Sequence, residues 1–366
     1  MTNNRLKIIL FWLLALIFAS NASMAQINDS TLLMKDEKPD FSTNTFHIIR
    51  VEDERAAPKE TARLLLLNNS GTSISRVFHL QGGDVFAIKN FINRNFSQTD
   101  TLRPIVLTLK QYQLTETSAS NNEIAGNLVI ECQFGLQREY GVVTPLISYK
   151  GGYHYTRAAG QKEVPPTILR RGIINAMSFF NNWLKQHINS DIRLARAVKV
   201  NFTDYTEQPE GDTIYYSALR PITWADFQDK PRAGNFEAEV FTGIGFNEQT
   251  VVENGLIKLT IAVKVYLPKS AAWAKGDKDS YALDHEQRHF DIAKIIGEHF
   301  KQKIAAMVLA VWDYDGFINE QYLETLREQT RMQNQYDRET RHGMDREEQE
   351  IWDKRIDTEL KLLRVK

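Results

Sequence analysis

Hydrophobic residues in the N-terminal half of the chain form two kinds of segment. Four segments are rich in β-branched and aromatic residues and are bounded by polar turns, which predicts strands at residues 46–51, 105–114, 126–134 and 141–149. Two other segments repeat apolar residues at helical spacing, one after Asp84 and one from Pro165 to Leu184. These elements predict a small mixed α/β domain over residues 45–200.

The C-terminal half starts with alternating segments and then becomes helical. Residues 201–213 contain Pro209 and Gly211 among polar side chains, which predicts a linker. Apolar and polar residues alternate over residues 237–246 and 256–267, on either side of an Asn-Gly turn, which predicts an antiparallel strand pair. From Asp279 onward the apolar spacing is helical, as it is over residues 319–338 and 347–363. We therefore predict an α+β protein with a second domain over residues 214–366.

The first 25 residues have the pattern of a signal peptide. Arg5 and Lys7 precede an apolar run over residues 8–19, and Ser23 and Ala25 are the small side chains that a signal peptidase recognises. The run is shorter than the ~20 residues of a membrane-spanning helix. We predict cleavage after Ala25, then a polar tether over residues 26–44, and a periplasmic or secreted protein without a transmembrane anchor after cleavage.

Composition narrows the class of protein further. Of the 366 residues, 42% are hydrophobic and 25% are charged, as in ordinary globular proteins. The formal net charge is -1, so we expect no nucleic-acid partner. The one cysteine, Cys132, cannot form an intramolecular disulfide, so stability has to come from burial of apolar surface.

The segment from His285 to His289 reads His-Glu-Gln-Arg-His, an HExxH motif within a predicted helix. Residues four apart lie on the same face of a helix, so both imidazoles can bind one metal ion, typically zinc. Glu286 lies ~100° around the helix, where its carboxylate can take a proton from a water on the metal and pass it to a leaving amine. The motif predicts His285 and His289 as zinc ligands and Glu286 as the catalytic base.

A third protein ligand has to come from outside the motif. On the same helix His299 is ~15 Å beyond His289 along the axis, and Asp291 points away from it. His342 lies downstream, where the helical pattern breaks just before a glycine. We predict His342 as the third ligand, with Glu339 and Asp337 as alternatives.

Two residues near this break have two interpretations each. Tyr336 could donate a hydrogen bond to the oxyanion formed during peptide hydrolysis, or it could pack the corner between two helices. Asp337 could hold the far nitrogen of a ligating histidine, or it could cap a helix.

Four ordered motifs in the C-terminal half resemble a domain-of-unknown-function family of predicted secreted HExxH zinc peptidases of bacterial envelopes. The matching pieces are Trp-x-Asp-Phe within residues 219–227, residues 270–273, residues 285–291 and residues 336–343, followed by Gln349 and Trp352. The resemblance covers residues 215–356. It implies a zincin-like metallopeptidase fold with His285, His289 and Glu286 in their motif roles, and it implies no particular substrate.

We therefore expect a secreted or periplasmic zinc-dependent metallopeptidase that hydrolyses a peptide or protein substrate, with an N-terminal domain that binds an envelope partner. Two alternatives stay open. One is a non-catalytic envelope binding protein with a structural or degenerate metal site, and the other is a metal-dependent amidase that acts on cell-wall peptides.

Overall fold

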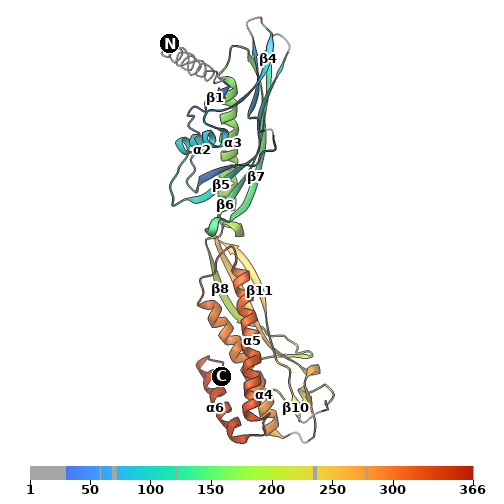
Figure 1. Ribbon diagram of the computed structural model, residues 1–366. Coiled ribbons are helices and arrows are strands. Elements are labelled where there is room, and N and C mark those ends of the chain that lie inside the picture. Colours follow the sequence, from blue (N-terminus) through green and yellow to red (C-terminus); the bar gives the residue numbers. More distant parts are fainter. Residues whose placement is uncertain are drawn as a thin grey trace, which may run out of the picture. The chain divides into compact units, whose positions relative to one another are not determined.

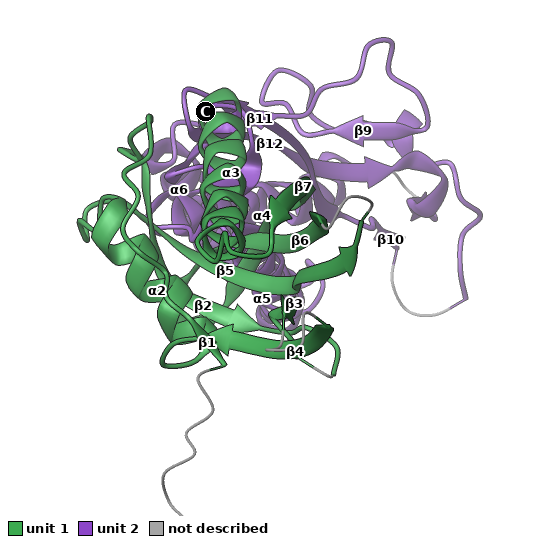
Figure 2. Ribbon diagram, turned by 90° about the horizontal axis from the view of Figure 1, so that it is seen from above, with its two compact units in different colours: residues 1–186 green, residues 187–366 purple. Residues whose placement is uncertain are grey.

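The computed structural model describes residues 30–57, 59–67, 72–119, 123–233, 237–276 and 279–365. The chain divides into two compact units, Met1–Gln186 and His187–Lys366, which Figure 2 shows in different colours. Helices and sheets occur in both units, so the predicted α+β class is confirmed (Figure 1). The predicted signal peptide lies outside the described residues. Within the described ranges, no helix is both long and apolar enough to cross a membrane.

The first unit is built on a seven-stranded sheet in the order β1-β4-β3-β5-β6-β7, with β2 paired to β5. Its strands are β1 (Thr31–Leu32), β2 (Phe46–Asp53), β3 (Ala62–Leu67), β4 (Ser73–Leu80), β5 (Arg103–Ser118), β6 (Glu123–Gln137) and β7 (Val143–Ala158). The helices are α2 (Asp84–Asn95), α3 (Val164–His187) and the short 3-10 turn η2 (Glu139–Gly141). The ring of Phe180 on α3 stacks on Phe134 of β6 with centroids 4.3 Å apart, so α3 packs against the sheet.

All four predicted strands and both predicted helices of this unit are present, but the sequence pattern missed β1, β3 and β4. The predicted polar tether over residues 26–44 is wrong for its described part. Thr31–Leu32 pair in parallel with β4, and both Leu32 and Met34 are buried. Two isolated apolar side chains in a polar segment give no periodic pattern, although each fills a place in the core.

The second unit has a four-stranded sheet covered by helices. The sheet contains β8 (Ala197–Asp204), β9 (Thr213–Tyr215), β11 (Gly243–Glu253) and β12 (Leu256–Pro268), and a separate pair is formed by β10 (Ala238–Glu239) and β13 (Trp273–Ala274). The helices are α4 (Ser280–Ala305), α5 (Tyr314–Thr340) and α6 (Arg346–Leu362), with the 3-10 turns η3 (Ile192–Leu194), η4 (Trp224–Asp226) and η5 (Lys269–Ala271). Strand β12 pairs with β11, β8 and β9, so it is the centre of the sheet.

The boundary between the units lies earlier than the predicted domain boundary. The prediction divided residues 197–204 between the end of the first domain and the start of the linker, but they form β8, which pairs in parallel with β12 of the second unit. Its alternating residues Val198, Val200 and Phe202 pack against the core of that unit. Because β8 and β12 are far apart in the sequence, no local pattern indicates that they pair.

The predicted hairpin is present with a shifted first strand. Glu253 pairs with Leu256 across a two-residue turn, and Asn254 and Gly255 have φ values of 53° and 70°, which the favoured hairpin turns require. The first strand is β11, at residues 243–253, rather than residues 237–246. Residues 247–251 of β11 are all exposed. Apolar and polar residues therefore do not alternate over this part of the edge strand, and the sequence pattern does not predict it.

Helix α4 is held close to the central strand. Asp279 caps its start by accepting a hydrogen bond from the Ala282 amide, and its apolar residues Phe290, Ile296 and Phe300 belong to the core of the unit. A Cβ atom at Gly297 would come within 2.9 Å of the Val265 side chain on β12. The glycine therefore allows the helix to approach the sheet closely, and the HExxH residues lie on the preceding turns of this anchored helix.

Candidate metal centre

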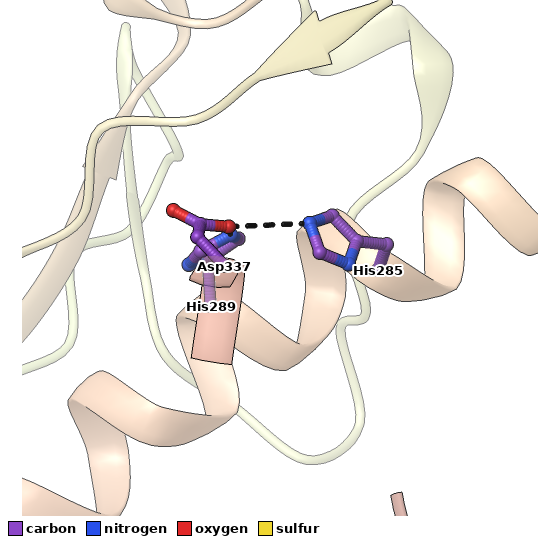
Figure 3. Close-up of side chains that lie close together, drawn as sticks. All are labelled: His285, His289 and Asp337. Atoms are coloured by element: carbon purple, nitrogen blue, oxygen red, sulfur yellow. Dashed lines mark ion pairs between the residues drawn. The ribbon is translucent and has the colours of Figure 1, made fainter. Parts of the chain in front are cut away.

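Helix α4 brings the two histidines of the motif together. The ring centroids of His285 and His289 are 5.1 Å apart, and the rings are nearly perpendicular, at 88°. Nε2 of each ring faces the same oxygen, Oδ1 of Asp337, at 3.5 Å from His285 and 3.0 Å from His289 (Figure 3). One ligand atom from each of the three residues lies within 4.8 Å of the others, so the group has the spacing of a metal site.

Asp337 reaches this group from the last turn of α5. The helical pattern over residues 319–338 already includes it, but α5 continues to Thr340, beyond the start of the break expected near residues 336–343, and residues 341–345 separate it from α6. Arg341, His342 and Gly343 have φ values of 49°, 54° and 77°, in the left-handed region. Asp337 therefore lies within a helix and extends its carboxylate from one turn before the helix end.

The chemistry of Asp337 fits a metal ligand. Its Oδ1 atom is buried and has no hydrogen-bond donor of suitable geometry among the described residues. Burial alone would raise the pKa of Asp337, but the adjacent imidazoles of His285 and His289 outweigh it and hold this pKa well below its usual value. An ionised, buried oxygen that faces two imidazole nitrogens is suited to a divalent cation with nitrogen and oxygen ligands, such as zinc.

The structure does not bring His342 into this group of three, although it was the predicted third ligand. Its side chain is 43% exposed, and its Nδ1 atom lies 3.4 Å from Oδ1 of Asp337, but it is not one of the three grouped residues. The reason is the helix end, because His342 follows the last turn whereas Asp337 is part of it. The other alternative, Glu339, is engaged elsewhere, since its carboxylate accepts a hydrogen bond from the indole of Trp352.

Glu286 is buried next to the histidines, with 5% of its surface exposed. Its Oε2 atom accepts a hydrogen bond from the Val240 amide at 3.1 Å, in the segment that follows β10. Burial raises the pKa of Glu286, and the two imidazoles of the motif act in the opposite direction. A carboxyl with a raised pKa holds a proton more readily than an exposed glutamate does, which suits a group that takes a proton and later returns it.

Tyr336 packs the site, which is the second of its two predicted interpretations. It is fully buried, and its ring stacks on His285 with centroids 4.8 Å apart and contacts the edge of His289. Its hydroxyl accepts a hydrogen bond from Gln349 at 2.6 Å and faces the His285 carbonyl. Because Tyr336 is buried and its hydroxyl is already bonded to Gln349, the oxyanion role predicted for Tyr336 does not fit its position.

Helix geometry excluded His299 and Asp291 as metal ligands, and the structure shows what these residues contact instead. His299 faces glutamates of the neighbouring helices, with Nε2 3.0 Å from Glu359. Asp291 is fully buried and accepts hydrogen bonds from Tyr216 and Gln287. Both residues therefore stabilise the packing around α4 at a distance from the candidate ligands.

The sequence reasoning missed two glutamines that contact the histidines. Oε1 of Gln349, on α6, lies 2.9 Å from Nδ1 of His285, and Oε1 of Gln333, on α5, is hydrogen-bonded to Nδ1 of His289. Gln349 appeared only as part of the family resemblance, and Gln333 was not considered. The sequence spacing between Gln333 and Asp337 could have indicated Gln333, because residues four apart lie on the same face of a helix.

Comparison with known families gives one match within this unit. Residues 249–343 match the family described as bacterial protein of unknown function, DUF922. The DUF922 segment includes both histidines, Glu286 and Asp337, and it ends before α6. No curated protein sequence matches the chain.

Two solved structures show limited likeness to the chain. Protein XCC0632 from Xanthomonas campestris, of family DUF330, is 8% identical, with a TM-score of 0.27 over 42% of this chain and 91% of that chain. An uncharacterized protein is 10% identical, with a TM-score of 0.21 over 41% of this chain and 99% of that chain. Neither likeness bears on the function.

Zinc binding at this site should release a proton from His289. Burial alone would lower the pKa of this residue, but Asp337 and Glu286 outweigh it and raise the pKa of His289 to about 9 in the metal-free chain. The proton is therefore bound below pH ~9 and has to leave before Nε2 can hold a metal, so zinc affinity should rise roughly tenfold per pH unit between about pH 7 and 8. Calorimetric titration in buffers of different ionisation enthalpy measures the released proton, and a pH-independent affinity would contradict the expectation.

Proposed function

We propose that the second unit is a zinc-dependent metallopeptidase of the HExxH class, in which His285, His289 and Asp337 hold the ion and Glu286 is the general base. The observation that carries the proposal is the buried, ionised Oδ1 atom of Asp337, which faces Nε2 of both histidines. Two histidines and one carboxylate leave a fourth position for water or substrate, as in catalytic zinc sites.

In this proposal, the chemistry is divided between the ion and Glu286. Zinc polarises a peptide carbonyl and lowers the pKa of a bound water. Glu286 uses one oxygen to accept the Val240 amide, so its other oxygen is left to take the proton of the attacking water. Its raised pKa favours holding that proton until it is returned to the leaving amine.

The segment around Val240 supports a zincin-like arrangement of strand and helix. The Val240 amide is bonded to Glu286, and two residues further on the Thr242 carbonyl accepts a hydrogen bond from Gln329 of α5 at 2.9 Å. The backbone beside the candidate base is thus fixed from both helices. We propose that an extended peptide substrate binds next to this segment through backbone hydrogen bonds.

The proposal extends to the first unit and to the place of action. A pocket of about 690 Å³ next to the start of α2 is lined by charged side chains of both signs, among them Arg50, Lys89 and Asp53, and by apolar residues such as Phe86. We propose that this unit binds an envelope partner there, in the periplasm or outside the cell, in line with the predicted signal peptide.

The test is metal analysis combined with a peptide-cleavage assay on the protein without residues 1–25. We expect one zinc ion per chain, cleavage of a generic fluorescent protein substrate, loss of cleavage with a chelator, and recovery on addition of zinc. Bound zinc without any cleavage would contradict the peptidase and favour the binding protein. Cleavage of cell-wall peptides alone would favour the amidase.

A further inference from the structure

We propose that Gln333 and Gln349 are the positioning residues of the metal centre, and that they hold His289 and His285 with a proton on Nδ1 and a lone pair on Nε2. The inference rests on the proposed zinc site, and it gives a role to two residues that do not touch the metal. It follows from the hydrogen bonds of the two amide groups, because each amide has one orientation that its neighbours allow.

The amide of Gln333 is oriented by a carbonyl. Its Nε2 atom donates to the backbone oxygen of His289 at 2.8 Å and to Oγ1 of Thr242 at 3.1 Å. A backbone carbonyl can only accept, so the NH2 group has to face it and Oε1 has to face Nδ1 of His289. The amide oxygen can also only accept, so Nδ1 carries the proton. In the neutral ring the lone pair is then on Nε2, the atom that faces Asp337.

The amide of Gln349 is oriented in the same way by a carboxylate. Its Nε2 atom donates to Oδ1 of Asp353 at 2.9 Å and to the hydroxyl of Tyr336 at 2.6 Å. An ionised carboxylate only accepts, so Oε1 is left to face Nδ1 of His285, at 2.9 Å. The proton is again on Nδ1, and Nε2 of His285 faces Asp337.

The choice of an amide also sets the charge of the site. A carboxylate in either position would add negative charge and increase the electron donation of its imidazole, as outer carboxylates do at many zinc sites. Neutral amides orient the rings without that charge. Asp337 is then the one anionic group among the three ligands, which keeps a bound divalent ion strongly electrophilic.

The test uses Gln333→Met and Gln349→Met, which keep side-chain length and remove the amide. Gln329→Met is the matched control, because Gln329 lies one turn before Gln333 on α5 and bonds Thr242 but neither histidine. We expect zinc affinity to fall roughly 10- to 100-fold in each of the first two variants and by less than about twofold in the control. Gln333→Glu keeps an acceptor for Nδ1 and should recover part of the lost affinity.

Cobalt(II)-substituted protein gives a readout that a general packing defect would not produce. The wild type should show two slowly exchanging, metal-shifted ring N–H resonances in its proton spectrum, and each of the two Met variants should lose one. If the two Met variants kept both N–H resonances and full zinc affinity, the positioning role of the glutamines would be overturned. Metal binding without cleavage would overturn the peptidase alone, whereas a wild type that binds no metal would overturn both proposals.

Discussion

Replacing Glu286 with glutamine should reduce peptide hydrolysis by roughly 100-fold or more while the protein still binds one zinc ion. The amide cannot take a proton from water, so the general-base step is lost. The side chain is nevertheless the same size, and its carbonyl oxygen can still accept the hydrogen bond from the Val240 amide. Cleavage rate and zinc content measured on the same preparation separate the chemical role of Glu286 from a role in metal binding.

The matched control is Glu298→Gln on the same helix. Glu298 pairs with Lys294 and Lys301 at 2.7 Å, away from the candidate ligands. Its replacement removes one carboxylate from α4 without changing the group at the site, so the cleavage rate should stay within about twofold of the wild type. A Glu286→Gln variant as active as this control would exclude Glu286 as the base.

The parts of the fold that could be predicted from sequence are those in which one element buries one face. Helices α2, α3 and α4 each repeat apolar residues at helical spacing, and β12 alternates almost perfectly between buried and partly buried positions. The missed strand β4 and the misplaced strand β11 lack such a face. β4 is exposed over its first four residues, and β11 over five consecutive residues, so pairing with a neighbouring strand rather than burial maintains them.

The residues of the candidate site also divide into those that a local sequence pattern predicts and those that it does not. His285, Glu286 and His289 are local, since a single helical turn sets their spacing, and the motif was visible in five consecutive residues. Asp337 depends on where α5 ends and on how α5 lies against α4, and neither is encoded in a short window. The sequence therefore offered three polar residues near the helix end, and the prediction preferred His342 to Glu339 and Asp337. Only the folded chain shows that Asp337 is the one grouped with His285 and His289.

Asp337→Asn should lower zinc affinity by more than about 100-fold, whereas His342→Ala should lower it by less than about tenfold. Asparagine removes the anionic oxygen that faces both imidazoles, while it keeps the size of the side chain. The half-exposed His342 is not one of the three grouped residues, although its Nδ1 atom lies 3.4 Å from Oδ1 of Asp337, so its loss leaves all three candidate ligands in place. Competition with a chromophoric chelator at fixed pH measures both affinities.

The comparison of these two variants decides between Asp337 and His342 as the third ligand. A larger loss in His342→Ala would mean that the last turn of α5 unwinds when the metal binds and lets the histidine replace the carboxylate. The same result would reduce the charge of the site, because an anionic ligand would be exchanged for a neutral one. Equal losses in the two variants would indicate that both residues bind the ion, which would fill the position that the proposed peptidase keeps for water.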